Sequence, residues 1–129
     1  DQARSAATQF GGYRERAANS FKDNNNLSYF LGIDATDTGG AMLMMGDHNM
    51  GQGNLGTPPP PERVWVNYTA LLLTNSSQIP IDQVMYTDLQ HQRQGNVMLG
   101  DNSVQGWSSK AFVAGLRSSG DRQNRLMFP

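Results

Sequence analysis

The 129-residue sequence contains no cysteine and little charge. The absence of cysteine excludes disulfide bonds, thiolate metal sites and a cysteine nucleophile. Charged residues make up 16% of the chain, below the ~25% usual for soluble domains. The net charge is −1, and the ten basic residues are dispersed without a basic run. A nucleic-acid partner, which needs a concentrated positive surface, is therefore disfavoured.

Long apolar runs are missing as well. The apolar runs, such as Ala70 to Leu73, fall far short of the ~20 apolar residues that a transmembrane helix needs. No signal peptide is recognisable. The chain does have 14 glycines and 37% hydrophobic residues, which is enough for a globular protein with its own core. We therefore expect residues 1–129 to form a single domain.

The clearest pattern lies in residues 95–107 and predicts a β-hairpin. Val97 and Leu99 recur at the strand period of two. Asp101 and Asn102 then provide a two-residue turn, because both tolerate the positive φ that primed turns require. We expect two antiparallel strands joined at this point.

A helix is predicted directly after the hairpin, over residues 108–120. Ser108 or Ser109 can cap its first turn. Gly120 stands where a left-handed residue would end it, whereas Gly115 inside it costs about 1 kcal/mol relative to alanine. One apolar stripe at helical spacing defines the buried side: Phe112, Val113 and Leu116.

Three earlier segments have strand character: residues 27–33, 41–45 and 62–73. Residues 41–45 are apolar enough for a strand buried on both faces, which would pair antiparallel with residues 27–33. Residues 46–61 are rich in glycine and proline and predict a long loop. In the first strand, three apolar side chains share one face: Tyr29, Leu31 and Ile33.

These patterns predict an α+β fold: an antiparallel β-sheet with one C-terminal helix and long Gly/Pro-rich loops. We expect four segments along the domain. They are a polar loop region at 1–26, a β-rich core at 27–107, the helix at 108–120 and an extended tail at 121–129.

A calcium site is the one ion site that the sequence suggests. Asp34, Asp37 and Asp47 flank the first two strands, with Thr36 and Thr38 nearby. Calcium prefers such oxygen donors. The regular Asp-x-Asp-x-Asp-Gly loop is absent, and turn formation is the alternative interpretation of these aspartates. No other cofactor is expected.

Two further functions remain open alongside a structural role. A hydrolase could use His48 or His91 with an aspartate and a serine, but no Gly-x-Ser-x-Gly elbow presents a nucleophile. We therefore do not expect an enzyme, and interpret His91 as structural, its ring bonding a backbone carbonyl near the hairpin. A secreted carbohydrate-binding module would need exposed stacking aromatics, for which the candidates are Trp65, Tyr68 and Trp107.

The hairpin segment also carries a family resemblance. His91, nine intervening residues and Asp101 resemble the "His, nine residues, Asp-Gly" signature of pilin-like proteins common in Planctomycetes and Verrucomicrobia. Asn102 stands where that family has glycine, a change that asparagine tolerates in a left-handed turn. The ending Asn-Arg-Leu-Met-Phe-Pro, at residues 124–129, resembles the family's "Asn-Arg-Leu-x-x-Pro" terminus.

Two upstream blocks, residues 26–34 and 46–49, resemble further family segments. The resemblance implies a type IV pilin-like or type II secretion pseudopilin-like subunit, an exported bacterial protein of the cell envelope or the extracellular space. Its partners would be copies of itself or other pilin-like subunits. The family's long apolar N-terminal helix, its only membrane contact, has no counterpart in this sequence, so we expect the C-terminal globular part. The implied scaffold residues are His91, Asp101, Asn102, Trp107 and residues 124–129.

Overall fold

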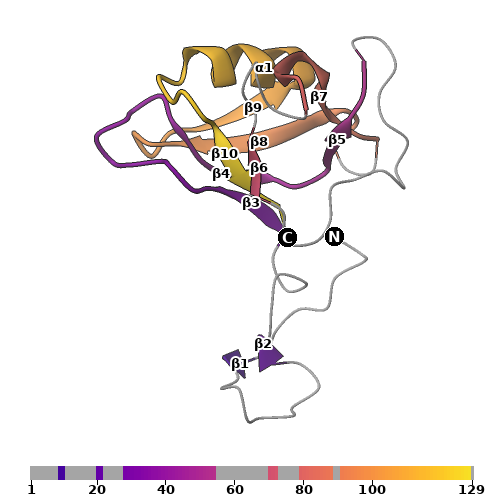
Figure 1. Cartoon of the computed structure of the whole chain (residues 1–129). Helices are drawn as coiled ribbons and strands as arrows, with labels where there is room; N and C mark the ends of the chain where they lie inside the picture. The colour runs from indigo at the N-terminus through magenta and orange to yellow at the C-terminus, as the bar shows by residue number, and fades with distance from the viewer. Residues whose placement is uncertain are drawn as a thin grey trace.

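The computed structural model describes residues 9–10, 20–21, 28–54, 70–72, 79–88 and 91–128. Within these ranges the protein is α+β, with an antiparallel sheet and one α-helix near the C-terminus (Figure 1). The predicted fold class is therefore confirmed at this level. No helix in the described part of the chain is long and apolar enough to cross a membrane.

Five strands form the main sheet, in the order β10–β3–β4–β8–β9, and every neighbouring pair is antiparallel. A short sixth strand, β6, pairs with the outer side of β10. The bounds are β3 Tyr29–Gly32, β4 Leu43–Asp47, β6 Ala70–Leu72, β8 Gln94–Leu99, β9 Val104–Ser108 and β10 Arg125–Met127.

Two smaller sheets accompany the main one. β5 (Met50–Gln52) pairs antiparallel with β7 (Val84–Tyr86). The 3-10 helix η3, Ile81–Gln83, leads into β7. β1 (Gln9–Phe10) pairs in parallel with β2 (Ser20–Phe21). The predicted loop at residues 46–61 is wrong in its first part, because it holds the end of β4 and all of β5; residues 55–61 lie outside the described residues.

The helix prediction is confirmed. α1 spans Ser109–Ser118, and the Ser108 hydroxyl accepts a hydrogen bond from the Ala111 N–H at 3.3 Å. Gly120 has a φ of +79°, the left-handed conformation expected just past a helix C-terminus. The predicted stripe is buried: Phe112, Val113 and Leu116.

The core lies between α1 and one face of the main sheet, as the position of α1 in Figure 1 shows. We call this sheet face the covered face. The Phe112 ring lies edge-on to those of Phe30 on β3 and Tyr86 on β7, with centroids 5.8 and 5.6 Å apart. Such contacts add to the area that the rings bury. Other fully buried side chains on this side include Val97, Leu116, Leu126 and Phe128.

Gly115 in α1 has a packing role that its helix propensity does not reveal. A Cβ on Gly115 would lie 2.4 Å from the Trp107 ring. Trp107 pairs with Gly95 across β8 and β9, and its ring is 6.1 Å from that of Phe112. The helix therefore accepts a residue that costs about 1 kcal/mol, because a larger side chain would exclude the tryptophan.

The hairpin is confirmed, but its turn differs from the prediction. Leu99 and Ser103 close a three-residue loop through a Leu99 N–H to Ser103 carbonyl bond of 2.9 Å. Asn102 has a φ of +66°, whereas Asp101 is not left-handed. The Asp101 carboxylate instead accepts a hydrogen bond from the Ser103 N–H, and this bond lowers the pKa of Asp101. A turn followed by one left-handed residue is the common three-residue hairpin loop.

β4 pairs antiparallel with β3 as predicted, but it is not buried on both faces. A register shift between Leu43 and Met45 sets Leu43 opposite Leu99 and Met45 opposite Met98. Such a bulge changes which face a side chain occupies. Leu43 is therefore 4% exposed in the core, whereas Met45 is 36% exposed on the other side.

The segment predicted as an extended tail is an interior strand of the sheet. β10 lies between β3 and β6, and Leu126 is buried. Asn124, with a φ of +48°, precedes it and donates to the carbonyls of Leu116 and Asp121. The last residues thus connect the C-terminus of α1 to a strand next to the edge of the sheet.

Candidate functional site

The face of the main sheet opposite α1, which we call the open face, carries a row of apolar side chains. Successive register pairs place one such residue on each of five adjacent strands. Residues directly opposite one another in antiparallel strands point to the same face. This apolar row consists of Met127, Leu31, Met45, Met98 and Val104.

The apolar row remains accessible. Met45 and Val104 are 36% and 65% exposed, and the other three members are partly buried. Tyr29 shares the face of Leu31 on β3 and is 52% exposed, and Ile33, directly after β3, is 45% exposed. A contiguous exposed apolar strip of this kind is typical of an interaction surface.

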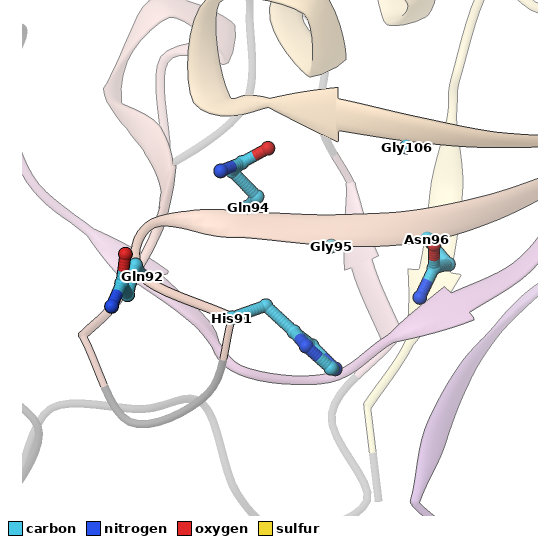
Figure 2. A pocket seen from close by; sticks show the side chains of 6 residues that line it. All are labelled: His91, Gln92, Gln94, Gly95, Asn96 and Gly106. Atoms are coloured by element: carbon cyan, nitrogen blue, oxygen red, sulfur yellow. The ribbon is translucent and has the colours of Figure 1, made fainter.

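Next to the apolar row, the same face becomes polar and hollow. A cavity of about 510 Å³ lies beside the segment that leads into β8. Figure 2 shows the His91 ring extending along β8 toward Asn96. We call this cavity the polar hollow; its lining residues are His91, Gln92, Gln94, Gly95, Asn96 and Gly106.

Asp47 connects the residues around the polar hollow. Its carboxylate Oδ2 accepts the Asn96 backbone N–H at 2.7 Å and the Asn96 side-chain amide at 3.2 Å. The same oxygen lies 3.6 Å from Nε2 of His91. Asp47 is 6% exposed, so a mostly buried carboxylate lies at the edge of an open cavity.

Tyr86 lies on the core side of Gly95, across the sheet from the polar hollow. A Cβ on Gly95 would meet the Tyr86 ring at 2.3 Å and its hydroxyl at 2.9 Å. Within the described residues the buried hydroxyl has no hydrogen-bond partner. Burial, together with the charge of Asp47, raises the pKa of Tyr86 far above its ordinary range. The phenol therefore stays protonated, and its O–H is an unused donor.

The segment that carries His91 has an unusual backbone. His91, Gln92 and Arg93 have consecutive φ values of +49°, +48° and +66°, although left-handed backbone costs L-residues roughly 1–2 kcal/mol each. Arg93 anchors the segment, because its side chain bonds the Asp88 carboxylate and its N–H bonds the Thr87 carbonyl. Strain of this kind often occurs where a side chain is held for binding.

The three predicted calcium ligands do not come together. The Arg125 guanidinium binds the Asp34 carboxylate through Nε and Nη2 and lowers the pKa of Asp34. Asp47 pairs with Tyr29 at the start of β3, whereas Asp34 follows its end, and Asp37 is exposed in the next turn. Across the ranges that the structure describes, no three His, Asp or Glu side chains are grouped to hold a metal ion.

His91 does not make the backbone-carbonyl contact that the sequence predicts for it. His91 faces the Asp47 carboxylate, whereas the predicted kind of carbonyl contact belongs to His48, whose Nδ1 lies 2.8 Å from the Ser28 carbonyl. Trp107 faces α1 and packs on Gly115, so it is not a free stacking platform. Trp65 and Tyr68 lie outside the described residues.

Sequence reasoning missed the apolar row and the polar hollow. Each depends on strand register, and the hollow joins Asp47 to residues more than forty positions later. The one local signal was the alternation of Tyr29, Leu31 and Ile33 against Phe30, which marks a strand with apolar residues on both faces.

Comparisons of the chain with protein-family models, with curated proteins and with solved structures give no match.

Proposed function

We propose that this protein is a structural subunit, pilin-like or pseudopilin-like, of a type IV pilus or type II secretion filament. It acts by assembly at the cell envelope or outside the cell rather than by catalysis. The observation that carries this proposal is the apolar row on the open face of the sheet. The sequence resemblance around His91 and Asp101 and the antiparallel α+β architecture support it.

The dimensions of the apolar row suit a helix. Five strands about 4.8 Å apart give a row about 19 Å long, which a helix of about 13 residues would span. Bound there, the apolar stripe of a helix would contact Leu31, Met45 and Met98 at the centre. In the resembled family, the long N-terminal helix of a subunit provides such a stripe, and its neighbours in the filament provide others.

The side chains of the apolar row favour a role in assembly over a role in catalysis. Its members are aliphatic or thioether side chains, which have no acid, base or nucleophile to contribute. Methionine adapts its shape to different partners, so Met45, Met98 and Met127 suit a surface that packs against repeated subunits. Polar groups flank the row at Asp47 and Arg125, as the polar rim of an interface does.

The coding sequence upstream of Asp1 tests the proposal. We expect it to encode a short leader followed by about 20 apolar residues, enough for one membrane-spanning helix. An upstream catalytic domain, or an unrelated globular domain joined by a linker, would contradict the proposal.

A further inference from the structure

We propose that the polar hollow is a binding site for a saccharide. The proposal rests on the residues around Asp47, Asn96 and Gly106, and it stands independently of the proposed filament role. It differs from the stacking-aromatic site considered from the sequence, because none of the tryptophans or tyrosines considered there lines the hollow.

The lining excludes two broad ligand classes. It contains no lysine or arginine, and the nearby Arg93 already binds Asp88. The Asp47 carboxylate would repel an anion that entered without a compensating cation. The lining also contains no aliphatic or aromatic hydrocarbon side chain, whereas sites for apolar ligands are lined predominantly by such residues.

Cations and peptides fit less well than a neutral ligand. Asp47 Oδ2 and His91 Nε2 are 3.6 Å apart, but they are two donors where zinc sites use at least three protein ligands. Asp47 Oδ2 also already accepts two N–H groups from Asn96. The hollow opens on the face of the paired strands β8 and β9, whereas a peptide adds to a sheet along the edge of a strand.

Sugar hydroxyls match the groups that remain. A hydroxyl both donates and accepts, while the exposed side-chain amide of Gln94 offers both functions and the Asn96 side-chain oxygen accepts. Gly106 lies directly opposite Asn96. The nearest non-neighbouring atom to a Cβ at Gly106 would be 4.0 Å away, so the floor there is bare and a flat ring can approach the sheet. The volume of about 510 Å³ falls in the range of small-molecule sites.

Two features indicate that the hollow is built rather than incidental. The left-handed segment holds His91 over the cavity despite its backbone cost. The Asp47 carboxylate accepts the Asn96 side-chain amide at 3.2 Å and lies 3.6 Å from the His91 ring, so it orients two of the lining residues from the buried side. Both features hold lining side chains in fixed positions, as a binding site requires.

The test is an NMR titration of the ¹⁵N-labelled chain with glucose, galactose, mannose and N-acetylglucosamine, from millimolar to about 0.1 M. At least one sugar should give saturable shifts at the amides of Asn96, Gly106 and His91. Gly106→Val should fill the floor and weaken binding at least about tenfold. Because a Cβ at Gly106 meets no close neighbour, this variant should keep the melting temperature of the wild type.

The matched control is Val104→Ile, which adds bulk to the same face of β9 outside the hollow; it should bind as the wild type does. The proposal fails if none of the four sugars gives saturable shifts, or if Gly106→Val binds as tightly as Val104→Ile. Shifts at the same amides with zinc or calcium chloride, but not with sugars, would overturn it in favour of a cation site.

Discussion

The two faces of the main sheet differ in how deeply their apolar side chains are buried. The covered face buries Phe30, Val97 and Leu126 against α1 almost completely. The open face presents the apolar row, in which Met45 and Val104 remain exposed. Both faces are apolar, but only one has a covering layer among the described residues. The comparison separates residues that stabilise the fold from residues that remain accessible.

This difference has a direct energetic consequence. Removing a fully buried side chain costs its transfer free energy and leaves a cavity. Removing a side chain that water already contacts costs little. Substitutions on the covered face should therefore lower the free energy of unfolding by several kcal/mol, whereas those on the open face should change it little.

Phe30→Ala should have the largest effect, a loss of about 3–5 kcal/mol in the free energy of unfolding. Phe30 is fully buried and contacts the rings of Phe112 and Phe128. The matched change on the open face, Met45→Ala, should cost less than about 1 kcal/mol. Urea denaturation of both variants measures the difference. Equal losses would mean that the two faces contribute alike to folding.

Asn124→Ala should come next, at about 2–3 kcal/mol. The substitution removes hydrogen bonds to the carbonyls of Leu116 and Asp121 and places alanine at a φ of +48°. Asn124→Gly should recover the backbone part of the loss but not the hydrogen bonds. If the alanine and glycine variants melted alike, the left-handed backbone would contribute nothing.

Gly115→Ala should destabilise the protein by about 1–2 kcal/mol. Overpacking typically costs 1–3 kcal/mol and outweighs the ~1 kcal/mol gain in helix propensity, because the new methyl collides with Trp107. Chemical denaturation gives the magnitude. Gly106→Ala on the open face, where space is free, should change stability by no more than about 0.5 kcal/mol. A stabilised Gly115→Ala would contradict the packing of Trp107 on α1.

The smallest effect should be a pH dependence at the edge of the open face. The Arg125 guanidinium lowers the pKa of Asp34 below its ordinary 3.8. The stability from this pair is therefore fully present above that ordinary value and is lost as the pH falls through the lowered pKa. The difference in melting temperature between Asp34→Asn and the wild type should shrink as the pH falls below 3.8. A constant difference across this range would exclude the linkage.

Local chemistry explains which parts of the fold could be predicted. The helix could be predicted because its signals lie within a few turns of each other: the capping Ser108, the apolar stripe and Gly120. The hairpin follows from alternation, but its loop type did not, because the choice between two and three loop residues depends on how Leu99 pairs with Ser103. Local patterns thus located elements without fixing their register.

Long-range pairing determines the rest. The bulge between Leu43 and Met45 turns Met45 to the open face, and nothing in the run Ala-Met-Leu-Met-Met marks the place. The polar hollow needs Asp47 beside Asn96, and the tail becomes a strand only when β3 and β6 flank it. Gly115 is unfavourable by helix propensity alone, and its close contact with Trp107 explains why glycine is present there.

The most direct test of the assembly role uses the absence of cysteine from the chain. Met45→Cys places a single thiol in the apolar row, and Ala114→Cys places one on the exposed side of α1. Both thiols should react with a maleimide in the purified protein. In cell-envelope fractions from the native host, the thiol at position 45 should be protected while that at position 114 still reacts. Equal reactivity of position 45 in the purified and envelope samples would contradict the proposal that the apolar row is an assembly surface.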